Sequence, residues 1–194
     1  MRSLIISLAV AGALSVGSAA AADLIVEAPV AEAATSSNLY VKLYGGGTFP
    51  NTLAWDGEDY DLEAGWFIGA AIGTEFAPGF SVELDASASS ANYVDDDGQS
   101  SAALFANLVY TAPVSDELSL YLGAGVGLIG VEYDGDSNSG FGGQVFAGLG
   151  YEVAENVTLF GELRYQSTFD TVDLDGWDVE HNRAAALVGV KFGF

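Results

Sequence analysis

The chain ends with the stretch NRAAALVGVKFGF, residues 182–194, in which apolar side chains alternate with small, charged or other side chains. A period of two places successive side chains on opposite faces of a β-strand. The stretch therefore predicts a strand with one apolar face and one mixed face. The apolar face carries Ala184, Ala186, Val188, Val190, Phe192 and Phe194, and the mixed face carries Arg183, Leu187, Gly189, Lys191 and Gly193.

Comparable apolar segments recur along the chain from Asn38 onward. The breaks after the second, fourth and sixth segments are short, and those after the first, third, fifth and seventh are longer, as in Pro50 to Glu63. Even strand number with alternating short and long connections predicts an all-β, eight-stranded antiparallel up-and-down barrel. The predicted strands are 38–49, 64–76, 80–90, 100–111, 118–131, 141–153, 157–168 and 182–194.

Composition excludes several classes of protein. Acidic residues outnumber basic ones by 27 to 5, so a surface that binds nucleic-acid phosphates is excluded. After residue 22 no stretch approaches the ~20 continuous apolar residues of a membrane-spanning helix. The 194 residues suit one domain, and the absence of cysteine means that the fold does not depend on disulfides.

The N-terminus has the layout of a secretory signal. Arg2 precedes an apolar run from Leu4 to Val16, which is followed by small residues up to Ala22. We expect residues 1–22 to be a cleaved signal peptide, 23–37 to be a flexible leader, and 38–194 to be the barrel domain.

The basic residues share one face of the predicted strands. Removal of Arg2 with the signal reduces the five basic residues to four, and strand parity puts all four on the same side as several carboxylates. We expect this face to line the lumen as a packed polar core, in which Lys42 reaches Glu75; an ion-selective pore is the alternative. The expected lumen charge network is Lys42, Glu75, Glu83, Asp85, Glu162, Arg164, Arg183 and Lys191.

A soluble barrel would turn its charged face outward, so the surroundings must be decided by other features. The apolar face has aromatic residues at both ends and small or aliphatic residues between, as expected for the two interfaces of a membrane. Most acidic residues lie in the long breaks. The sequence therefore predicts a transmembrane barrel whose interface girdle is Phe49, Trp66, Phe76, Phe80, Tyr110, Phe141, Tyr151, Tyr165, Phe192 and Phe194.

The opening YVKLYGGG, residues 40–47, and the ending VGVKFGF, residues 188–194, resemble the OmpA-like, opacity-protein-like family of small outer-membrane β-barrel proteins. The leader resembles that of alphaproteobacterial members, among them porin-family surface antigens. The resemblance implies location in the Gram-negative outer membrane and contact with its lipid and lipopolysaccharide. It also implies delivery by periplasmic chaperones to the barrel-assembly machinery, for which Val190, Phe192 and Phe194 form the assembly signal.

Candidate catalytic and metal sites are weak. His181 is the only histidine, and Ser167 on the neighbouring strand faces the other way, so a nucleophile and base are badly placed. The stretch DGDSNSG, residues 134–140, resembles the start of a calcium loop, but Val145 stands where a glutamate is required. We expect no catalytic residue, cofactor or dedicated metal site, and leave open that divalent cations bridge the acidic loops to lipopolysaccharide.

The leading functional hypothesis is a non-enzymatic outer-membrane surface protein that contributes to envelope integrity, with acidic loops available for surface contacts. The alternatives are a small or gated pore, an outer-membrane enzyme that modifies lipid, and a soluble ligand-binding barrel.

Overall fold

The computed structural model describes nine ranges of the chain: 38–49, 51–55, 58–62, 64–91, 99–133, 136–169, 172–174, 177–179 and 182–194. The expected signal peptide (1–22) and leader (23–37) lie outside the described residues, as does His181. Within the described ranges, no helix has the length and apolarity needed to span a membrane.

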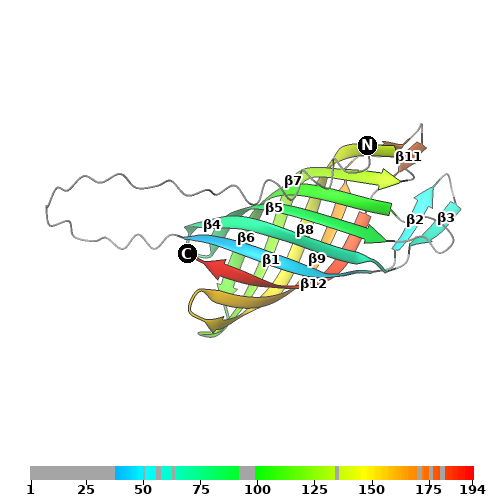
Figure 1. Cartoon of the computed structure of the whole chain (residues 1–194). Helices are drawn as coiled ribbons and strands as arrows, with labels where there is room; N and C mark the ends of the chain where they lie inside the picture. Colours follow the sequence, from blue (N-terminus) through cyan, green and yellow to red (C-terminus); the bar gives the residue numbers. More distant parts are fainter. Residues whose placement is uncertain are drawn as a thin grey trace, which may run out of the picture.

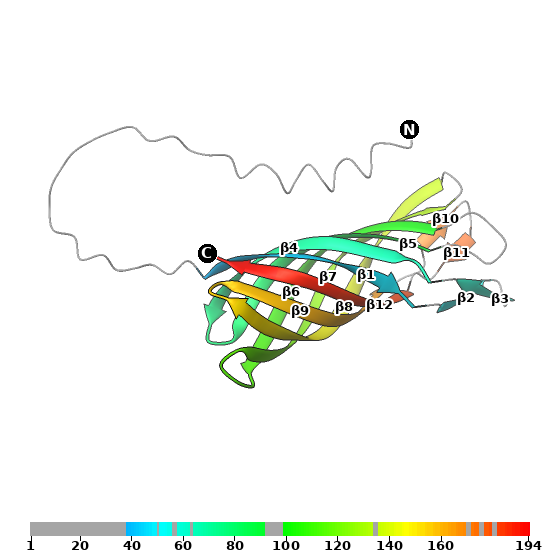
Figure 2. The ribbon, with the colours of Figure 1, turned by 60° about the horizontal axis from the view of Figure 1, so that its bottom comes forward.

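Long antiparallel strands close into a barrel (Figures 1 and 2), as predicted from the sequence. The order around the wall is β1-β12-β9-β8-β7-β6-β5-β4, and β4 pairs with β1 to complete the ring. The barrel strands are β1 (Leu39–Thr48), β4 (Trp66–Ala77), β5 (Phe80–Ala91), β6 (Gln99–Pro113), β7 (Leu118–Tyr133), β8 (Asp136–Ala154), β9 (Val157–Thr168) and β12 (Asn182–Gly193).

Two small hairpins occupy the long breaks that we predicted without strands. One pairs β2 (Asn51–Trp55) with β3 (Glu58–Leu62), and the other pairs β10 (Val172–Leu174) with β11 (Trp177–Val179). Figure 1 shows both at the end of the barrel opposite the C-terminus.

The long break predicted after the fifth strand is wrong. β7 and β8 remain paired as far as Tyr133 and Asp136, so only residues 134 and 135 separate them. Residues 136–140 of the stretch that resembles a calcium loop therefore belong to β8, and residues 134 and 135 lie outside the described residues. The sequence did not indicate that β8 begins before residue 141, because glycine and serine do not give the apolar alternation that is typical of a strand.

The three short turns lie at the end of the barrel where the described chain begins and ends. Gly79 between β4 and β5 has φ 77°, and Asn156 between β8 and β9 has φ 63°. Both residue types tolerate this left-handed conformation. Phe194 donates its backbone N–H to the carbonyl of Leu39, at 3.0 Å, which fixes the C-terminus beside the start of β1.

Burial alternates along the strands with a period of two. In β9, the side chains of Phe160, Glu162 and Arg164 are buried, while those of Leu159 and Leu163 are exposed. The charged face therefore points into the barrel and the apolar face points outward, as the parity of the sequence predicted.

Large aromatic rings on the inner face lie opposite glycines on neighbouring strands. A Cβ atom added at any of these glycines would overlap the ring across from it. Because glycine has no side chain, the aromatic ring on the neighbouring strand can occupy the space beside it. In this way the rings fill a narrow lumen. The paired residues are Tyr40 and Gly73, Tyr44 and Gly69, Phe146 and Gly123, Tyr121 and Gly148, and Phe160 and Gly189.

Candidate functional site

The middle of the lumen is crossed by buried ion pairs. The Lys42 ammonium on β1 lies 3.2 Å from a Glu83 carboxylate oxygen on β5 and 3.6 Å from a Glu162 oxygen on β9. Tyr40 donates a hydrogen bond to the same Glu83 oxygen at 2.9 Å, and Tyr121 donates to Glu162 at 3.0 Å. Lys42 thus joins opposite parts of the wall.

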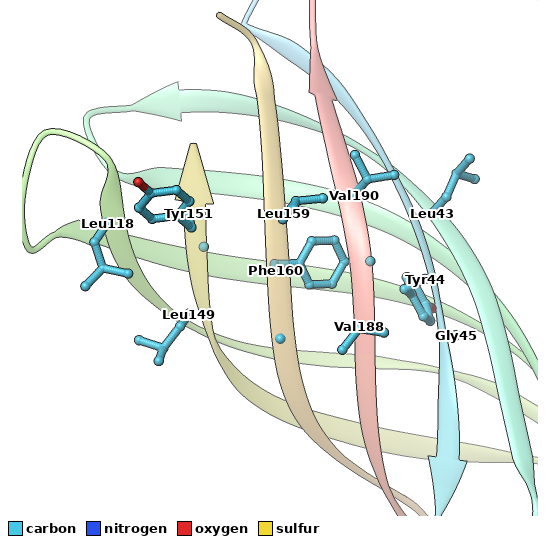
Figure 3. Close-up of a pocket in the computed structure, with 13 residues that line it drawn as sticks. Leu43, Tyr44, Gly45, Leu118, Leu149, Tyr151, Leu159, Phe160, Val188 and Val190 are labelled. Atoms are coloured by element: carbon cyan, nitrogen blue, oxygen red, sulfur yellow. The ribbon is translucent and has the colours of Figure 1, made fainter. Parts of the chain in front are cut away.

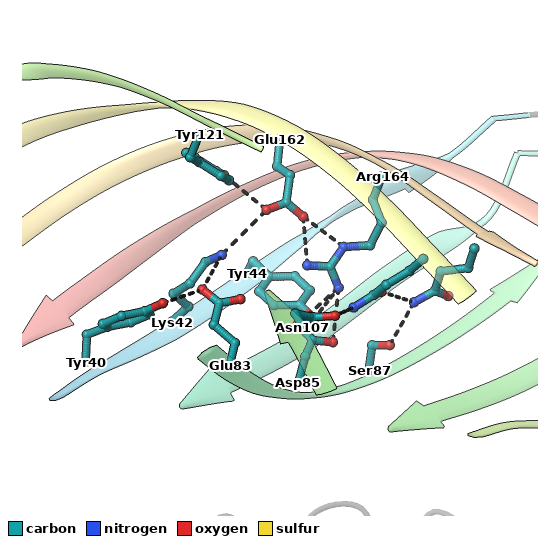
Figure 4. A network of polar contacts seen from close by, with 12 residues as sticks. Tyr40, Lys42, Tyr44, Glu83, Asp85, Ser87, Asn107, Tyr121, Glu162 and Arg164 are labelled. Carbon is teal, nitrogen blue, oxygen red and sulfur yellow. Dashed lines mark hydrogen bonds and ion pairs between the residues drawn. The ribbon is translucent and has the colours of Figure 1, made fainter. Parts of the chain in front are cut away.

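Arg164 on β9 forms the second half of this network (Figure 4). Its guanidinium donates to both Asp85 oxygens at 3.1 Å and lies 2.7 Å from a Glu162 oxygen. It also donates to the Tyr44 hydroxyl at 2.7 Å, and Tyr44 donates in turn to Asp85 at 2.8 Å. Glu162 therefore links the two cations into one network.

Aromatic rings surround both cations. The Lys42 nitrogen lies 5.0 to 5.3 Å from the ring centroids of Tyr121, Phe146 and Phe160. The guanidinium carbon of Arg164 lies 4.6 Å from the centroid of Tyr44 and 5.0 Å from that of Phe146. Cation–π attraction adds to the ion pairs at such distances, and the rings occupy the space that water would otherwise fill.

An uncharged polar layer lies beside the network and was missed by the sequence analysis. Gln144 donates to Asn107 at 2.7 Å, and Gln166 donates to Gln144 at 2.9 Å. All three side chains are buried. Strand parity puts Gln166 on the same face as Glu162 and Arg164, but parity alone does not show which neutral side chains meet across the lumen.

Arg183 is separated from the other cations. It is buried and donates a hydrogen bond to the Ser89 hydroxyl, which shares a 2.8 Å hydrogen bond with Ser101. The register places Ser89 and Ser101 opposite each other, near the long-loop ends of β5 and β6. Of the expected charge network, the structure brings together Lys42, Glu83, Asp85, Glu162 and Arg164.

The predicted contact between Lys42 and Glu75 is wrong. Lys42 is level with Ala71 on β4, and Glu75 lies further toward the short turns by four residues, or roughly 13 Å of strand. Glu75 is exposed, and its carboxylate accepts a hydrogen bond from the Gly79 N–H at 3.4 Å. Lys191 is partly buried near the same end, with its ammonium 5.3 Å from the Tyr40 ring centroid.

A cavity of about 310 Å³ opens at this short-turn end of the lumen. Glu75, Glu152 and Lys191 line it, as do Lys42 and Glu83. The ion pairs with Asp85 and the rings of Tyr44 and Phe146 lie beyond this cavity.

The residues assigned to the interface girdle all lie on the outer wall. Their exposed fractions run from 37% for Phe192 to 68% for Phe141. The rings of Phe76, Phe80 and Tyr110 lie together at the short-turn end. The centroid of Phe80 lies 6.4 Å from that of Phe76 and 4.8 Å from that of Tyr110. Val190 is half-buried, and Phe192 and Phe194, which complete the expected assembly signal, are exposed.

Of the two residues considered for catalysis, the structure describes only Ser167, because His181 lies outside the described residues. Ser167 is half-buried and donates to the Thr168 carbonyl at 3.2 Å. Across the described ranges, no three His, Cys, Asp or Glu side chains form a group that could hold a metal ion.

Comparisons with known proteins agree with this architecture. Residues 6–192 match a family model described as the outer membrane protein β-barrel domain. Neisserial surface protein A is 17% identical with a TM-score of 0.65, and the match covers 81% of this chain and 98% of that one. OprG from Pseudomonas aeruginosa is 13% identical with a TM-score of 0.57, covering 82% and 97%. At these identities the solved structures show a shared fold. No curated protein matches the sequence.

Proposed function

The chain belongs to the outer membrane protein β-barrel domain family, and on that premise we propose that it is a non-enzymatic structural protein of the bacterial outer membrane. Its lumen is sealed by its own side chains, and its acidic long-loop end faces the cell surface. The resemblance to small OmpA-like barrels, which the family match and the shared folds confirm, supports this assignment.

The buried ion pairs that cross the lumen are the observation that carries the proposal. Lys42, Glu83, Asp85, Glu162 and Arg164 are each at most 4% exposed, and their ion pairs run across the barrel from β1 to β5 and β9. Breaking a buried pair leaves an uncompensated charge, so an ion could pass only at a large cost in free energy. Such a cross-section suits a structural protein better than a pore.

Planar-bilayer recording tests the seal. The purified, refolded barrel should give no stable conductance steps at moderate voltage, and a general pore from the same preparation should give steps as a positive control. Heat-dependent migration in electrophoresis verifies that the inserted protein is folded. Reproducible single-channel steps from the folded wild-type barrel would contradict the proposal.

A small or gated pore is the second candidate, and the cavity at the short-turn end favours it. This cavity of about 310 Å³ extends from the short-turn end of the barrel to Lys42 and Glu83, which are among its lining residues. A polar plug, formed by the buried side chains of Lys42, Glu83, Asp85, Glu162 and Arg164, then separates the cavity from the long-loop end. If the plug rearranges, Arg164→Ala should raise the frequency of conductance steps, whereas the outward variant Leu163→Ala should not.

The remaining parts of the proposal concern partners. The acidic long breaks contact anionic lipopolysaccharide through divalent cations, and the C-terminal strand is the signal for assembly. Chelator should then weaken lipopolysaccharide binding by the folded barrel. Loss of the gene should increase the sensitivity of the envelope to detergent, and expression of the wild-type chain should restore resistance.

Absence of catalysis is part of the same proposal. Overexpression of the folded barrel should leave the mass spectrum of lipid A unchanged. A new lipid A species that depends on His181 or Ser167 would instead support a lipid-modifying enzyme.

A further inference from the structure

On the outer wall, large apolar residues alternate with glycines in a row that crosses four neighbouring strands. Gly161 on β9 pairs with Leu149 on β8 and with Val188 on β12, and Val188 pairs with Gly45 on β1. Leu149 is 52% exposed and Val188 is 70% exposed, so this row faces outward. Because glycine has no side chain, the wall is hollow at Gly161 and Gly45, between larger neighbours.

An apolar groove of about 760 Å³ follows this hollow (Figure 3). The next outward row supplies one of its edges, through Leu159, Val190 and Leu43. The volume lies within the ~300–1,000 Å³ range of sites that hold small organic molecules. The groove is therefore large enough for part of a lipid.

The groove lies in the half of the barrel nearer the short turns. Leu118 begins β7, Leu159 is close to the start of β9, and Tyr151 is close to the end of β8. Tyr151 stands at the short-turn end of the groove among aliphatic side chains (Figure 3), and its side chain ends in a hydroxyl. An apolar groove with a tyrosine hydroxyl at the end nearest the membrane interface suits an amphiphile, whose apolar chain would lie in the groove and whose polar end would lie at the hydroxyl.

We propose that this groove holds an acyl chain of a glycerophospholipid from the periplasmic leaflet, with the headgroup beside Tyr151. The inference rests on the proposed function for one point, the placement of the short turns on the periplasmic side. A second copy of the chain fits less well, because the groove has 13 lining residues, whereas a stable interface takes about 20–30 residues a side.

Photocrosslinking in vesicles tests the groove. The probe is phosphatidylethanolamine with a diazirine in one acyl chain, diluted into unlabelled phosphatidylethanolamine and phosphatidylglycerol. After irradiation, mass spectrometry of peptides should find adducts several-fold enriched on the outward residues of β8, β9 and β12 around Leu149, Leu159 and Val188, relative to β5 and β6.

Two matched glycine variants separate the groove from the general wall. A Cβ atom added at Gly161 or at Gly130 would make only ordinary van der Waals contacts, at 4.0 and 3.7 Å respectively, and both residues face outward, but only Gly161 belongs to the groove. Gly161→Leu should reduce the enriched adducts to the level of the rest of the wall. Gly130→Leu should leave them unchanged. Heat-dependent migration verifies that both variants are folded.

Three outcomes would overturn the groove. They are uniform labelling around the barrel, unchanged enrichment in folded Gly161→Leu, and disulfide crosslinks between two chains that carry Leu149→Cys or Val188→Cys. Conductance recordings on the same vesicles keep the two claims apart. If the barrel does not conduct and is labelled uniformly, only the proposed lipid site is contradicted. If the barrel conducts and is labelled mainly at the groove, only the proposed sealed lumen is contradicted.

Discussion

Tyr44 on β1 lies directly opposite Gly69 on β4, and its ring occupies the space that a side chain at position 69 would need. The hydroxyl of the same ring donates to Asp85 and accepts from Arg164. One pair of residues therefore connects the strand register at the β1–β4 seam to the ion pairs in the middle of the lumen.

Gly69→Val should destabilise the barrel by displacing Tyr44. Overpacking of a filled interior typically costs about 1–3 kcal/mol, and the lost Tyr44 hydrogen bonds add to it. We expect a lower midpoint of urea unfolding in lipid vesicles. Gly130→Val, at an outward glycine where an added Cβ makes only ordinary van der Waals contacts, is the matched control and should keep the wild-type midpoint. Equal midpoints for the two variants would show that the Tyr44 ring is not confined there.

Arg164→Leu should lower the free energy of unfolding by about 3–5 kcal/mol, because Asp85 and Glu162 lose a buried cation. The double variant Arg164→Leu with Asp85→Asn should recover part of this loss, since one of the carboxylates is then neutral. Thermal unfolding in detergent measures both variants. A single variant as stable as wild type, or a double variant less stable than the single one, would refute the network.

The inward positions of Lys42, Glu83, Asp85, Glu162 and Arg164 could be predicted from strand parity, because a period of two needs only local sequence. Their partners could not. Lys42 meets Glu83 on β5 and Glu162 on β9, strands that are not its wall neighbours, since closure of the barrel brings opposite inner faces together. The predicted partner, Glu75, sits on an adjacent strand but too far toward the rim.

Strand ends were predictable where apolar alternation continues to the turn, as in β9 and β12. The start of β8 was not, because Asp136 to Gly140 lack apolar side chains and are held by pairing with β7. The Gln144, Asn107 and Gln166 layer also escaped prediction. Opposite charges on one face suggest ion pairs, but neutral amides give no such signal. Only the folded barrel shows that these three side chains form hydrogen bonds with one another.

A cation on the outer wall should destabilise the barrel according to its depth. Leu84 lies midway along β5, and Phe80 begins that strand in the girdle; both are exposed. An arginine on the lipid face costs about 2–4 kcal/mol at the bilayer midplane and about 0–1 kcal/mol near the interface. Leu84→Arg should therefore lose more stability than Phe80→Arg in vesicle unfolding. The reverse order would mean that the girdle has been misplaced.

Phe192→Ala combined with deletion of Phe194 should reduce the amount of barrel in the outer membrane several-fold, because the alternating aromatic ending is proposed to engage the assembly machinery. Phe80→Ala, which removes a girdle ring near the same end of the barrel, is the control. Membrane fractionation of cells measures both. Normal outer-membrane levels of the truncated chain would remove Phe192 and Phe194 from the proposed signal.

Spin labelling of the C-terminal strand tests most directly whether the apolar face meets lipid. The chain has no native cysteine, so Ala186→Cys and Val188→Cys can each carry a single nitroxide on the outer wall. In vesicles, relaxation of both labels should be dominated by oxygen, which concentrates in hydrocarbon, and little affected by a water-soluble nickel chelate. Strong relaxation by the chelate at both positions would place this face in water and contradict the account.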